Sequence, residues 1–332
     1  MASIELSVDL GSKFITIYQK GIGLVLREPA IAIATQNRNK LEIREAGYRA
    51  ESIMNGSLGG AKIISPIKEG IIVDEEMATM LLAHFLKRII PNTLIKPRVK
   101  AIVSICSSSS NSDRRAVEKC CLKAGIGEIT LVESPLSLLA YTGSVGGLFV
   151  DIGGGKTEIA AVTNHGIATG CTVNIAGDAF NNAIIDAFYM QYGIKIGDFT
   201  MEKLKKSALS FYLNDEGSYA VSGGSKDGTP RSLFVTAEGM RDAVIPLVDD
   251  VIEVIMSVLN QTPPELSAEI LRKGIFISGG SMHIPGLLDY IEQALELPVT
   301  PLEDIENAVA IGGAKFFDNK DLLSDMLGVK LA

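Results

Sequence analysis

The feature that most constrains the fold of this chain is a strand–turn–strand pattern that occurs twice. The turn Asp9–Gly11 lies between two strand-forming runs near the start of the chain, and the turn Asp151–Gly153 follows the apolar run Leu148–Val150. Glycine in such a turn lets the backbone approach a ligand closely and point consecutive N–H groups at a phosphate. Because one hairpin opens each half of the chain, the pair predicts a duplicated domain that closes on one nucleotide.

The segment FVDIGGGKTE ends like a P-loop, the glycine-rich phosphate-binding loop that precedes a helix. A P-loop has a glycine five residues before the glycine that precedes its lysine. Here that position holds Val150, and the residues after the turn form an apolar, β-branched run with little helical character. We therefore reject a P-loop and predict a β-hairpin, with strands at 148–151 and 157–163 around the glycine turn 153–155.

Two other features add to the nucleotide prediction. Asp9 and Asp151 each end a first strand, where a carboxylate can hold the hydrated Mg²⁺ that accompanies a nucleotide. Residues 274–282 predict a buried strand and a Gly-Gly turn, followed by a helix at 287–295. This turn lets a flat ring or a phosphate pack against the main chain, and an ordinary strand-to-helix turn is the alternative.

The composition argues against several classes of protein. The chain has 332 residues, of which 47% are apolar and 21% charged, which indicates a globular protein of two domains. A net charge of −8 without a basic stripe argues against nucleic acid as the main partner. We find no run of about 18 apolar residues and no secretion signal, and the adjacent Cys120 and Cys121 are expected to be reduced, so we expect a cytosolic setting.

Segments along nearly the whole chain carry a family resemblance. They are VDLGS, GIGLVLREPAIAIA, ISPIKEGIIVD, DRRAVEKCCLKAGI, DIGGGKTEIA, IAGDAFNNAI, TPPELSAEILRKGIFISGGSMHIPGL and AVAIGGAKF. With these motifs, the chain resembles the superfamily of actin, heat-shock chaperone ATPases and sugar kinases, and within it the bacterial actin MreB family. The order of the motifs is that superfamily's phosphate-1, connect-1, phosphate-2, adenosine and connect-2.

The resemblance implies an α/β, actin-like ATPase fold of two lobes. Each lobe would be built on an RNase-H-like mixed sheet flanked by helices, with ATP and Mg²⁺ in the cleft between the lobes. The first lobe is expected at 1–140, with a small subdomain at about 29–66 and the C-terminal helices 314–332 packed back on it. The second lobe is expected at 141–313, with a small subdomain at about 178–245.

The resemblance also implies which residues contact the nucleotide. They are Asp9, Gly11, Ser12, Lys13 and Phe14 in the first turn, Gly153, Gly154 and Gly155 in the second, Met201, Glu202, Lys203 and Leu204 beside the adenosine, and Gly279, Gly280, Ser281 and Met282 opposite. Asp9 and Asp151 would hold Mg²⁺ through water. Glu202 and Lys203 lie on a predicted helix, Met201–Phe211, after a loop Gly197–Thr200, and a solvated helix face is their alternative.

Two residues depart from the family pattern at the positions that orient or activate the attacking water. The family's connect-1 segment reads E-E-P-M-A-A-A, and Ser134 replaces the carboxylate that precedes the proline. In the family's G-G-G-T-T loop, Lys156 replaces the first threonine. Serine is too short and too weak a base for that role, and losing such a group costs about 10²–10⁴ in rate. With Asp151 as the remaining catalytic candidate, we expect slow or impaired ATP hydrolysis.

The position of the Lys156 side chain has several alternatives. Its ammonium group can contact the γ-phosphate, as the P-loop lysine does. It can also face solvent, or pair with Glu133 or Glu158. Glu133 itself is a poor substitute for the missing carboxylate, because its side chain should leave the strand on the opposite face.

Leu94 and Ile95 form an apolar loop tip flanked by Lys87, Arg88, Lys96 and Arg98. Apolar tips ringed by basic residues suit an anionic membrane surface, and a loop packed on its own lobe is the alternative. No N-terminal amphipathic anchor is expected, because the chain starts directly in its first strand. The tail, with Leu322, Leu323, Met326 and Leu327 on one helical face, is expected to dock on the first lobe. The serine run before Asp113 is expected to cap a helix at Asp113–Ala124.

The resemblance implies a self-associating protein at the inner face of the cell membrane. Head-to-tail protofilaments, usually paired antiparallel, would govern cell shape, or motility in a wall-less cell, and could include sister paralogues. A small-molecule kinase of the same superfamily is disfavoured because no catalytic Asp or sugar-binding insertion is apparent. A chaperone-type ATPase would need a substrate-binding domain after the nucleotide domain, and the chain ends at Ala332.

Overall fold

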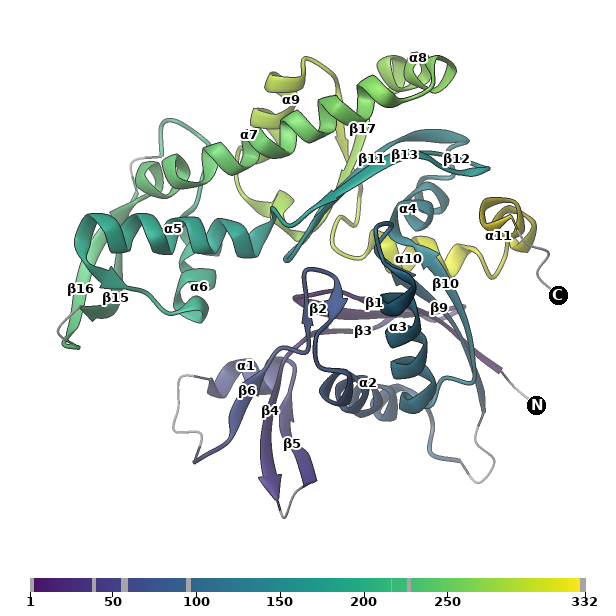
Figure 1. Cartoon of the computed structure of the whole chain (residues 1–332), viewed down its shortest axis with the longest axis horizontal. Coiled ribbons are helices and arrows are strands. Elements are labelled where there is room, and N and C mark those ends of the chain that lie inside the picture. Colours follow the sequence, from purple (N-terminus) through teal and green to yellow (C-terminus); the bar gives the residue numbers. More distant parts are fainter. Residues whose placement is uncertain are drawn as a thin grey trace. The chain divides into compact units, whose positions relative to one another are not determined.

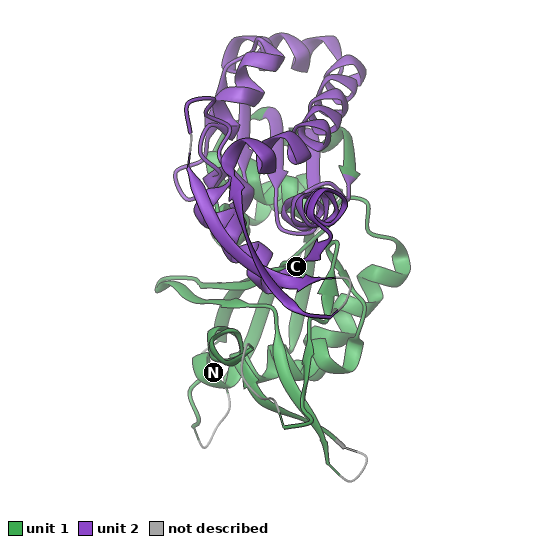
Figure 2. Ribbon diagram, turned by 90° about the vertical axis from the view of Figure 1, so that its left-hand side faces the viewer, with its two compact units in different colours: residues 1–146, 162–172, 306–332 green, residues 147–161, 173–305 purple. Residues whose placement is uncertain are grey.

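The computed structural model describes residues 3–37, 40–54, 59–93, 97–215, 217–225 and 228–328. The chain divides into two compact units (Figure 2). Unit 1 comprises residues 1–146, 162–172 and 306–332, and unit 2 comprises residues 147–161 and 173–305. The lobe boundaries implied by the resemblance stay a prediction. Among the residues described, no helix has both the length and the apolar character needed to cross a bilayer.

Unit 1 is built on a five-stranded sheet. Its strands are β1 (Ser3–Leu10), β2 (Phe14–Gln19), β3 (Gly23–Pro29), β9 (Arg98–Ile105) and β10 (Glu128–Glu133). Their order is β10-β9-β1-β2-β3; β2 is antiparallel to both β1 and β3, whereas β9 is parallel to β1 and β10. Leu6 and Val8 on one face of β1 and Ser7 on the other have no exposed surface, so this central strand is buried on both faces.

Smaller elements and helices complete unit 1 (Figure 1). The strands are β4 (Ala32–Asn37), β5 (Lys40–Ala46) and β6 (Lys62–Ile64), in the order β5-β4-β6, and the hairpin β7 (Ile67–Lys68) and β8 (Ile71–Ile72). The helices are α1 (Tyr48–Ile53), α2 (Glu75–Ile89), α3 (Asn111–Ala124), α4 (Ser134–Thr142), α10 (Ala308–Lys315) and α11 (Lys320–Leu327).

The backbone of helix α10 lies in close contact with helix α4 and strand β1. A Cβ atom added to Gly312 would overlap the carbonyl oxygen of Ser137 in α4, and one added to Gly313 would overlap the hydroxyl of Ser7 in β1. Gly312 requires glycine because a backbone carbonyl cannot move away at low cost, and a side chain at position 313 would have to displace the buried Ser7 hydroxyl. This close approach holds the C-terminal part of the chain on the sheet of unit 1.

Unit 2 contains most of a second five-stranded sheet. The strands are β11 (Gly146–Ile152), β12 (Thr157–Thr163), β13 (Gly166–Val173), β17 (Ile275–Ser278) and β18 (Val299–Pro301). Their order is β13-β12-β11-β17-β18, so three consecutive strands are again followed by two later strands on the far side of the first. The equal strand orders confirm the predicted duplication.

The rest of unit 2 is a small sheet and a set of helices. The small sheet has the order β14-β15-β16, formed by Ile194–Lys195, Ser218–Ser225 and Pro230–Thr236. The helices are α5 (Gly177–Tyr192), α6 (Asp198–Ala208), α7 (Ala237–Gln261), α8 (Pro264–Lys273) and α9 (Leu287–Leu295), with a short 3-10 helix, η1 (Gly280–His283). Val244, Val248, Val251 and Ile255 place one face of α7 in the core of this unit.

The helix predicted at Met201–Phe211 was wrong at both ends. Helix α6 begins at Asp198, in the segment predicted as a loop, because an acidic residue suits the first turn and Lys203 packs over the Phe199 ring at 4.3 Å. It ends at Ala208, because the chain turns extended and the N–H of Phe211 donates to the carbonyl of Pro285.

Other predicted elements are confirmed. The second hairpin and the helix at 287–295 have the predicted positions, except that β11 starts two residues earlier and ends one residue later than predicted. Helix α3 begins at Asn111, two residues before its predicted start, because Ser110 and Asp113 form a capping box. The predicted apolar face of the tail is partly buried in α11, where Leu323 and Met326 are covered.

Candidate functional site

The first turn, between β1 and β2, leaves no room for a side chain at its glycine. A Cβ atom on Gly11 would lie 2.7 Å from the carbonyl oxygen of Phe14. Asp9, one residue before the end of β1, is paired in register with Thr16 on β2 and Ser104 on β9. The sequence therefore places a carboxylate and a tight glycine turn together at one edge of the sheet.

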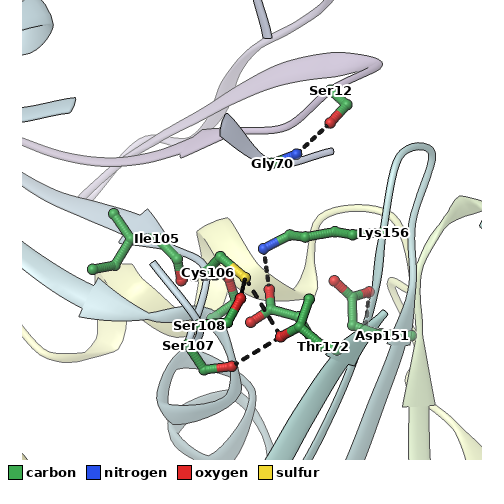
Figure 3. Close-up of polar contacts among 12 residues, drawn as sticks. Ser12, Gly70, Ile105, Cys106, Ser107, Ser108, Asp151, Lys156 and Thr172 are labelled. Carbon is green, nitrogen blue, oxygen red and sulfur yellow. Dashed lines mark hydrogen bonds and ion pairs between the residues drawn. The ribbon is translucent and has the colours of Figure 1, made fainter. Parts of the chain in front are cut away.

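The hydroxyl of Ser12 is engaged by the hairpin β7–β8. The backbone N–H of Gly70 donates to Ser12 Oγ at 2.8 Å (Figure 3). The two turn residues of that hairpin, Glu69 and Gly70, have φ values of 51° and 73°. This is the pair of left-handed residues that a tight hairpin turn requires, and a glutamate is strained there.

The Phe14 side chain contributes to packing within unit 1. The guanidinium group of Arg27 lies 3.7 Å from the centre of the Phe14 ring, and Arg27 also forms an ion pair with Glu306 at 2.8 Å. Lys13 is half-buried in the turn. A role of Lys13 and Phe14 in binding a nucleotide stays a prediction.

The second turn, between β11 and β12, is held by hydrogen bonds from other elements of unit 2. The N–H groups of Gly177 and Asp178, the first residues of α5, donate to the carbonyls of Gly153 and Gly154 at 3.2 and 2.7 Å. Ser281 Oγ in η1 also donates to the Gly153 carbonyl, at 2.8 Å. These bonds occupy carbonyl oxygens of the turn. Within the turn, the N–H of Gly153 donates to the carbonyl of Lys156 at 3.0 Å, so Gly153 does not offer its N–H group to a phosphate.

Asp151 is the last residue but one of β11, and its carboxyl group lies deep among protein atoms, although the residue keeps some exposed surface. Ser278 Oγ donates to its Oδ1 at 2.8 Å. Burial raises the pKa of Asp151 to about 6, the hydrogen bond from Ser278 opposes this shift, and the charge of Glu158 adds to it. A side chain on Gly279, whose φ is 99°, would overlap the carbonyl of Ile152 and approach this carboxyl group. Glycine is therefore required beside Asp151.

Lys156 forms an ion pair with Glu158 on the following strand (Figure 3). The Glu158 side chain is 1% exposed and that of Lys156 is 17% exposed, so the pair is largely withdrawn from solvent. Of the alternatives for Lys156, pairing with Glu158 is the one that the structure contains. A contact with a γ-phosphate stays a prediction.

Ser134 and Glu133 are also engaged within unit 1. Ser134 is buried at the start of α4 and its Oγ donates to the carbonyl of Ile105 at 3.1 Å. Glu133 forms an ion pair with Arg114 at 2.6 Å. Neither side chain is therefore arranged like a free carboxylate that could orient a water molecule.

The residues predicted beside the adenosine have different surroundings. Met201 and Leu204 are buried in the core of unit 2, whereas Lys203 is exposed. Glu202 receives hydrogen bonds from Asn181 and from the buried Lys205. Sequence reasoning missed Asn181 and Lys205, although the spacing of Glu202 and Lys205 on a predicted helix was a signal for the second.

The residues predicted opposite the adenosine also differ in their exposure and contacts. Gly280 is exposed, Ser281 braces the second turn, and Met282 is half-buried against the core of unit 2. Leu94 and Ile95 of the predicted membrane tip lie outside the described residues. Of their basic neighbours, Arg88 pairs with Glu28 and Arg98 with Glu128.

The serine run after β9 forms a polar contact with β13 in unit 1 (Figure 3). Cys106 Sγ lies 3.1 Å from Ser108 Oγ and 3.5 Å from Thr172 Oγ1. Ser107 Oγ lies 3.4 Å from the same Thr172 hydroxyl. The run is thus a packed connection as well as the cap of α3.

Comparison with known proteins identifies the family. The model of the MreB/Mbl protein family matches residues 3–325. The cell shape-determining protein MreB of Escherichia coli (strain K12) is 30% identical over 331 residues, covering 97% of this chain and 95% of that protein. The crystal structure of MreB5 of Spiroplasma citri bound to AMPPNP matches with a TM-score of 0.88 at 25% identity, covering 98% of this chain and 100% of that one. The chain therefore belongs to the MreB/Mbl family of cell shape-determining, actin-like proteins.

Proposed function

We propose that this chain binds ATP with Mg²⁺ through its two turns, polymerises into filaments that govern cell shape, and hydrolyses ATP slowly. The observation that carries the proposal is the duplication: two sheets of equal strand order, each with an aspartate and a glycine turn after its first strand. MreB5 of Spiroplasma citri has been crystallised with AMPPNP and with ADP, which supports nucleotide binding here.

The residues present fit such a ligand. Glycine turns can offer backbone N–H groups to a phosphate, and the second turn is fixed by bonds to the carbonyls of Gly153 and Gly154, although the N–H of Gly153 itself donates to Lys156. Asp9 and Asp151 would hold Mg²⁺ through water, and no cluster of protein ligands that could bind a metal directly occurs among the described residues. When bound, Mg²⁺ supplies positive charge that neutralises the phosphates.

Slow hydrolysis follows from the surroundings of Ser134 and Lys156. Phosphoryl transfer to water needs a placed nucleophile. Ser134 donates its hydroxyl to the carbonyl of Ile105, and Lys156 is held by the buried Glu158. Neither residue offers the carboxylate or hydroxyl that the family uses at these positions, so this chain is suited to binding ATP more than to cleaving it.

The proposed filament has partners that the resemblance to the MreB family suggests. Head-to-tail protofilaments, paired antiparallel, would lie at the inner face of the cell membrane, alone or with sister paralogues, and in a wall-less cell they would drive motility. A small-molecule kinase or a chaperone-type ATPase is the alternative function. Pelleting of the protein on addition of Mg-ATP, without sugar or peptide, distinguishes the filament from both alternatives.

The test of the whole proposal is a phosphate-release assay during assembly, with electron microscopy of the same samples. We expect filaments with ATP before much phosphate appears. A chain that binds no ATP contradicts the nucleotide proposal, and a chain that releases phosphate as fast as assembly proceeds contradicts slow hydrolysis. Samples without Mg²⁺ serve as the control.

Membrane contact is tested separately. We expect salt-sensitive co-sedimentation with anionic liposomes, because the Leu94–Ile95 tip has basic neighbours. The variant Leu94→Ser/Ile95→Ser should lose this binding, whereas Leu122→Ser, which changes an exposed leucine elsewhere in unit 1, should retain it. Equal binding of the double variant and the parent would remove the loop from consideration.

A further inference from the structure

Arg27 joins the first turn to the segment before helix α10, within unit 1. Its guanidinium group lies 3.7 Å from the centre of the Phe14 ring, and its Nη2 atom lies 2.8 Å from Glu306 Oε1. The Arg27 side chain is 18% exposed and that of Glu306 is 32% exposed, so water reaches only part of the ion pair. A planar guanidinium group that stacks on a ring and also pairs with a carboxylate holds its two partners in a fixed relation.

Phe14 carries this contact to the backbone of the first turn. It is the first residue of β2, and its carbonyl oxygen would lie only 2.7 Å from a Cβ atom on Gly11. Its ring also lies 6.3 Å, centre to centre, from the ring of Tyr48, the first residue of α1. The Phe14 ring is therefore confined by two side chains, and its displacement would shift backbone that lies against Gly11.

Glu306 lies where the chain passes between the two units. Unit 2 ends at Ile305, and unit 1 resumes at Glu306. The other three crossings fall within the strands β11, β12 and β13, whose backbones are held by pairing in one sheet. Residues 303–307, here called the connection, form a turn between β18 and α10. Backbone angles can change in such a turn at lower cost than inside a sheet.

The unit 2 side of the connection is bonded to residues beside the second turn. The N–H of Gly279 donates to the carbonyl of Ile305 at 2.8 Å. Gly279 itself lies against the Ile152 carbonyl and the Asp151 carboxyl group, at the end of β11. Two consecutive residues of the connection therefore have different anchors. Ile305 is bonded to the neighbourhood of the second turn, and Glu306 is paired with the arginine that packs on the first.

We propose that Arg27 is a positioning residue of the nucleotide site, which couples the first turn to the connection. It acts on the first turn through Phe14. It acts on the connection through Glu306, and the connection in turn holds the N–H of Gly279. This inference rests on the proposed function, because the nucleotide is the ligand that would bear on the first turn. Such coupling is reciprocal, so release of the connection must change the affinity of the first turn for its ligand.

The first measurement needs no nucleotide. Hydrogen exchange of the Gly279 amide is compared in the parent, Arg27→Gln and Glu306→Gln. Both variants remove the ion pair, so this amide should exchange about fivefold faster, because its acceptor belongs to the released connection. Lys100→Gln breaks an ion pair with Glu128 at 3.0 Å elsewhere in unit 1, and it should leave the amide unchanged. A general loss of stability would also speed the amides of β1, which should keep their parental rates.

The second measurement is calorimetry with Mg-ATP, with melting temperature as a check on folding. Arg27→Gln should weaken binding about 5- to 20-fold, because it removes the stacking on Phe14 as well as the ion pair. Glu306→Gln keeps the stacking and should weaken binding about threefold. The double variant should bind no more weakly than Arg27→Gln, because both changes break one path. Lys100→Gln should bind like the parent.

The outcomes separate this inference from the proposed function. Parental exchange of the Gly279 amide in both variants overturns the coupling, whether or not the chain binds ATP. Faster exchange with unchanged Mg-ATP affinity, in a chain that binds ATP, overturns the positioning role of Arg27. A double variant whose loss equals the product of the two single losses overturns the shared path. Faster exchange in a parent background that binds no ATP supports the contact with the connection and overturns the proposed function.

Discussion

The two phosphate-turn candidates occupy equivalent places in sheets of equal strand order, yet they are held differently. At the first turn Gly11 has no room for a side chain. The N–H of Gly70 donates to Ser12 Oγ, and the N–H of Ala30 donates to the carbonyl of Lys13 at 2.8 Å. The second is fixed by hydrogen bonds from α5 and η1 to the carbonyls of Gly153 and Gly154. Duplication therefore preserved the hairpin, while the contacts that hold it diverged.

This difference teaches where sensitivity to mutation should lie. The second turn depends on side chains and helix ends far along the chain, among them Ser281 and the group around Gly177. It also carries the substituted Lys156 and the buried Asp151. Substitutions that change a charged or polar side chain should therefore have their largest effects at the second turn. Substitutions that add a side chain to a glycine should have their largest effects at the first turn.

The largest expected effect comes from restoring the family residues. The double variant Ser134→Glu/Lys156→Thr should raise the rate of ATP hydrolysis more than tenfold, since the missing groups are worth about 10²–10⁴. The two changes should be strongly non-additive, because on the proposed function both residues would act on one water molecule. Single-turnover phosphate release measures the rate for the parent, each single variant and the double variant.

The Lys156→Thr variant should also change the stability of the protein, which has to be measured beside the rate. Removing the ammonium group deprives the buried Glu158 of a charged partner, which should lower the free energy of unfolding by about 1–3 kcal/mol. Lys203→Thr, at an exposed lysine of the same unit, should have a much smaller effect. A parent as fast as ordinary family members, with no response to either restoration, would show that other residues place the water.

The next effect concerns the two aspartates. Asp151→Ala should weaken Mg-ATP binding by about 100-fold, and Asp9→Ala by about 10-fold, the range seen when groups that hold a metal's ligands are removed. The larger loss is expected for Asp151 because Ser278 fixes its carboxyl group. Calorimetry with and without Mg²⁺ measures both, and equal losses would abolish this distinction between the turns.

Local patterns predicted much of the fold. The β-branched run at 157–163 and the glycines before it specify a hairpin, and the helix at 287–295 follows its turn as expected. Such elements are readable because their residues lie next to one another in the sequence. Helix α6 was misplaced because its first turn depends on the contact of Lys203 with Phe199, which propensity alone does not reveal.

The surroundings of the candidate site were less predictable. Asn181 and Glu202 meet across two helices, and Arg27 joins Phe14 to Glu306 near the other end of the chain. These contacts depend on how elements pack, so spacing in the sequence does not specify them. The pairing of Lys156 with Glu158 was foreseen as one alternative, because residues two apart on a strand share a face.

Adding a side chain to a turn glycine should have a smaller effect, and here the first turn should be the more sensitive of the two. Gly11→Ala should destabilise the protein by about 1–3 kcal/mol, because the added Cβ would press on the Phe14 carbonyl. Gly153→Ala, whose Cβ would lie 3.2 Å from the Lys156 carbonyl, should stay within about 1 kcal/mol of the parent. Urea unfolding measures both, and a larger loss at Gly153 would reverse the comparison.

The smallest effect tests the hydrogen bond from Gly70 to Ser12, which joins the first turn to the hairpin β7–β8. Ser12→Ala removes the acceptor of the Gly70 N–H group, which should make that amide exchange with solvent about fivefold faster, corresponding to about 1 kcal/mol. Ser52→Ala removes a hydroxyl that donates to the Arg49 carbonyl in its own helix segment, and it should leave the Gly70 amide unchanged. Unaltered exchange in Ser12→Ala would mean that the hairpin is held at the first turn by its own geometry, in spite of the strained Glu69. In that case the first turn would depend on the lack of space at Gly11 and on the bond from Ala30 to Lys13, and its contrast with the second turn, which α5 and η1 hold, would be sharper.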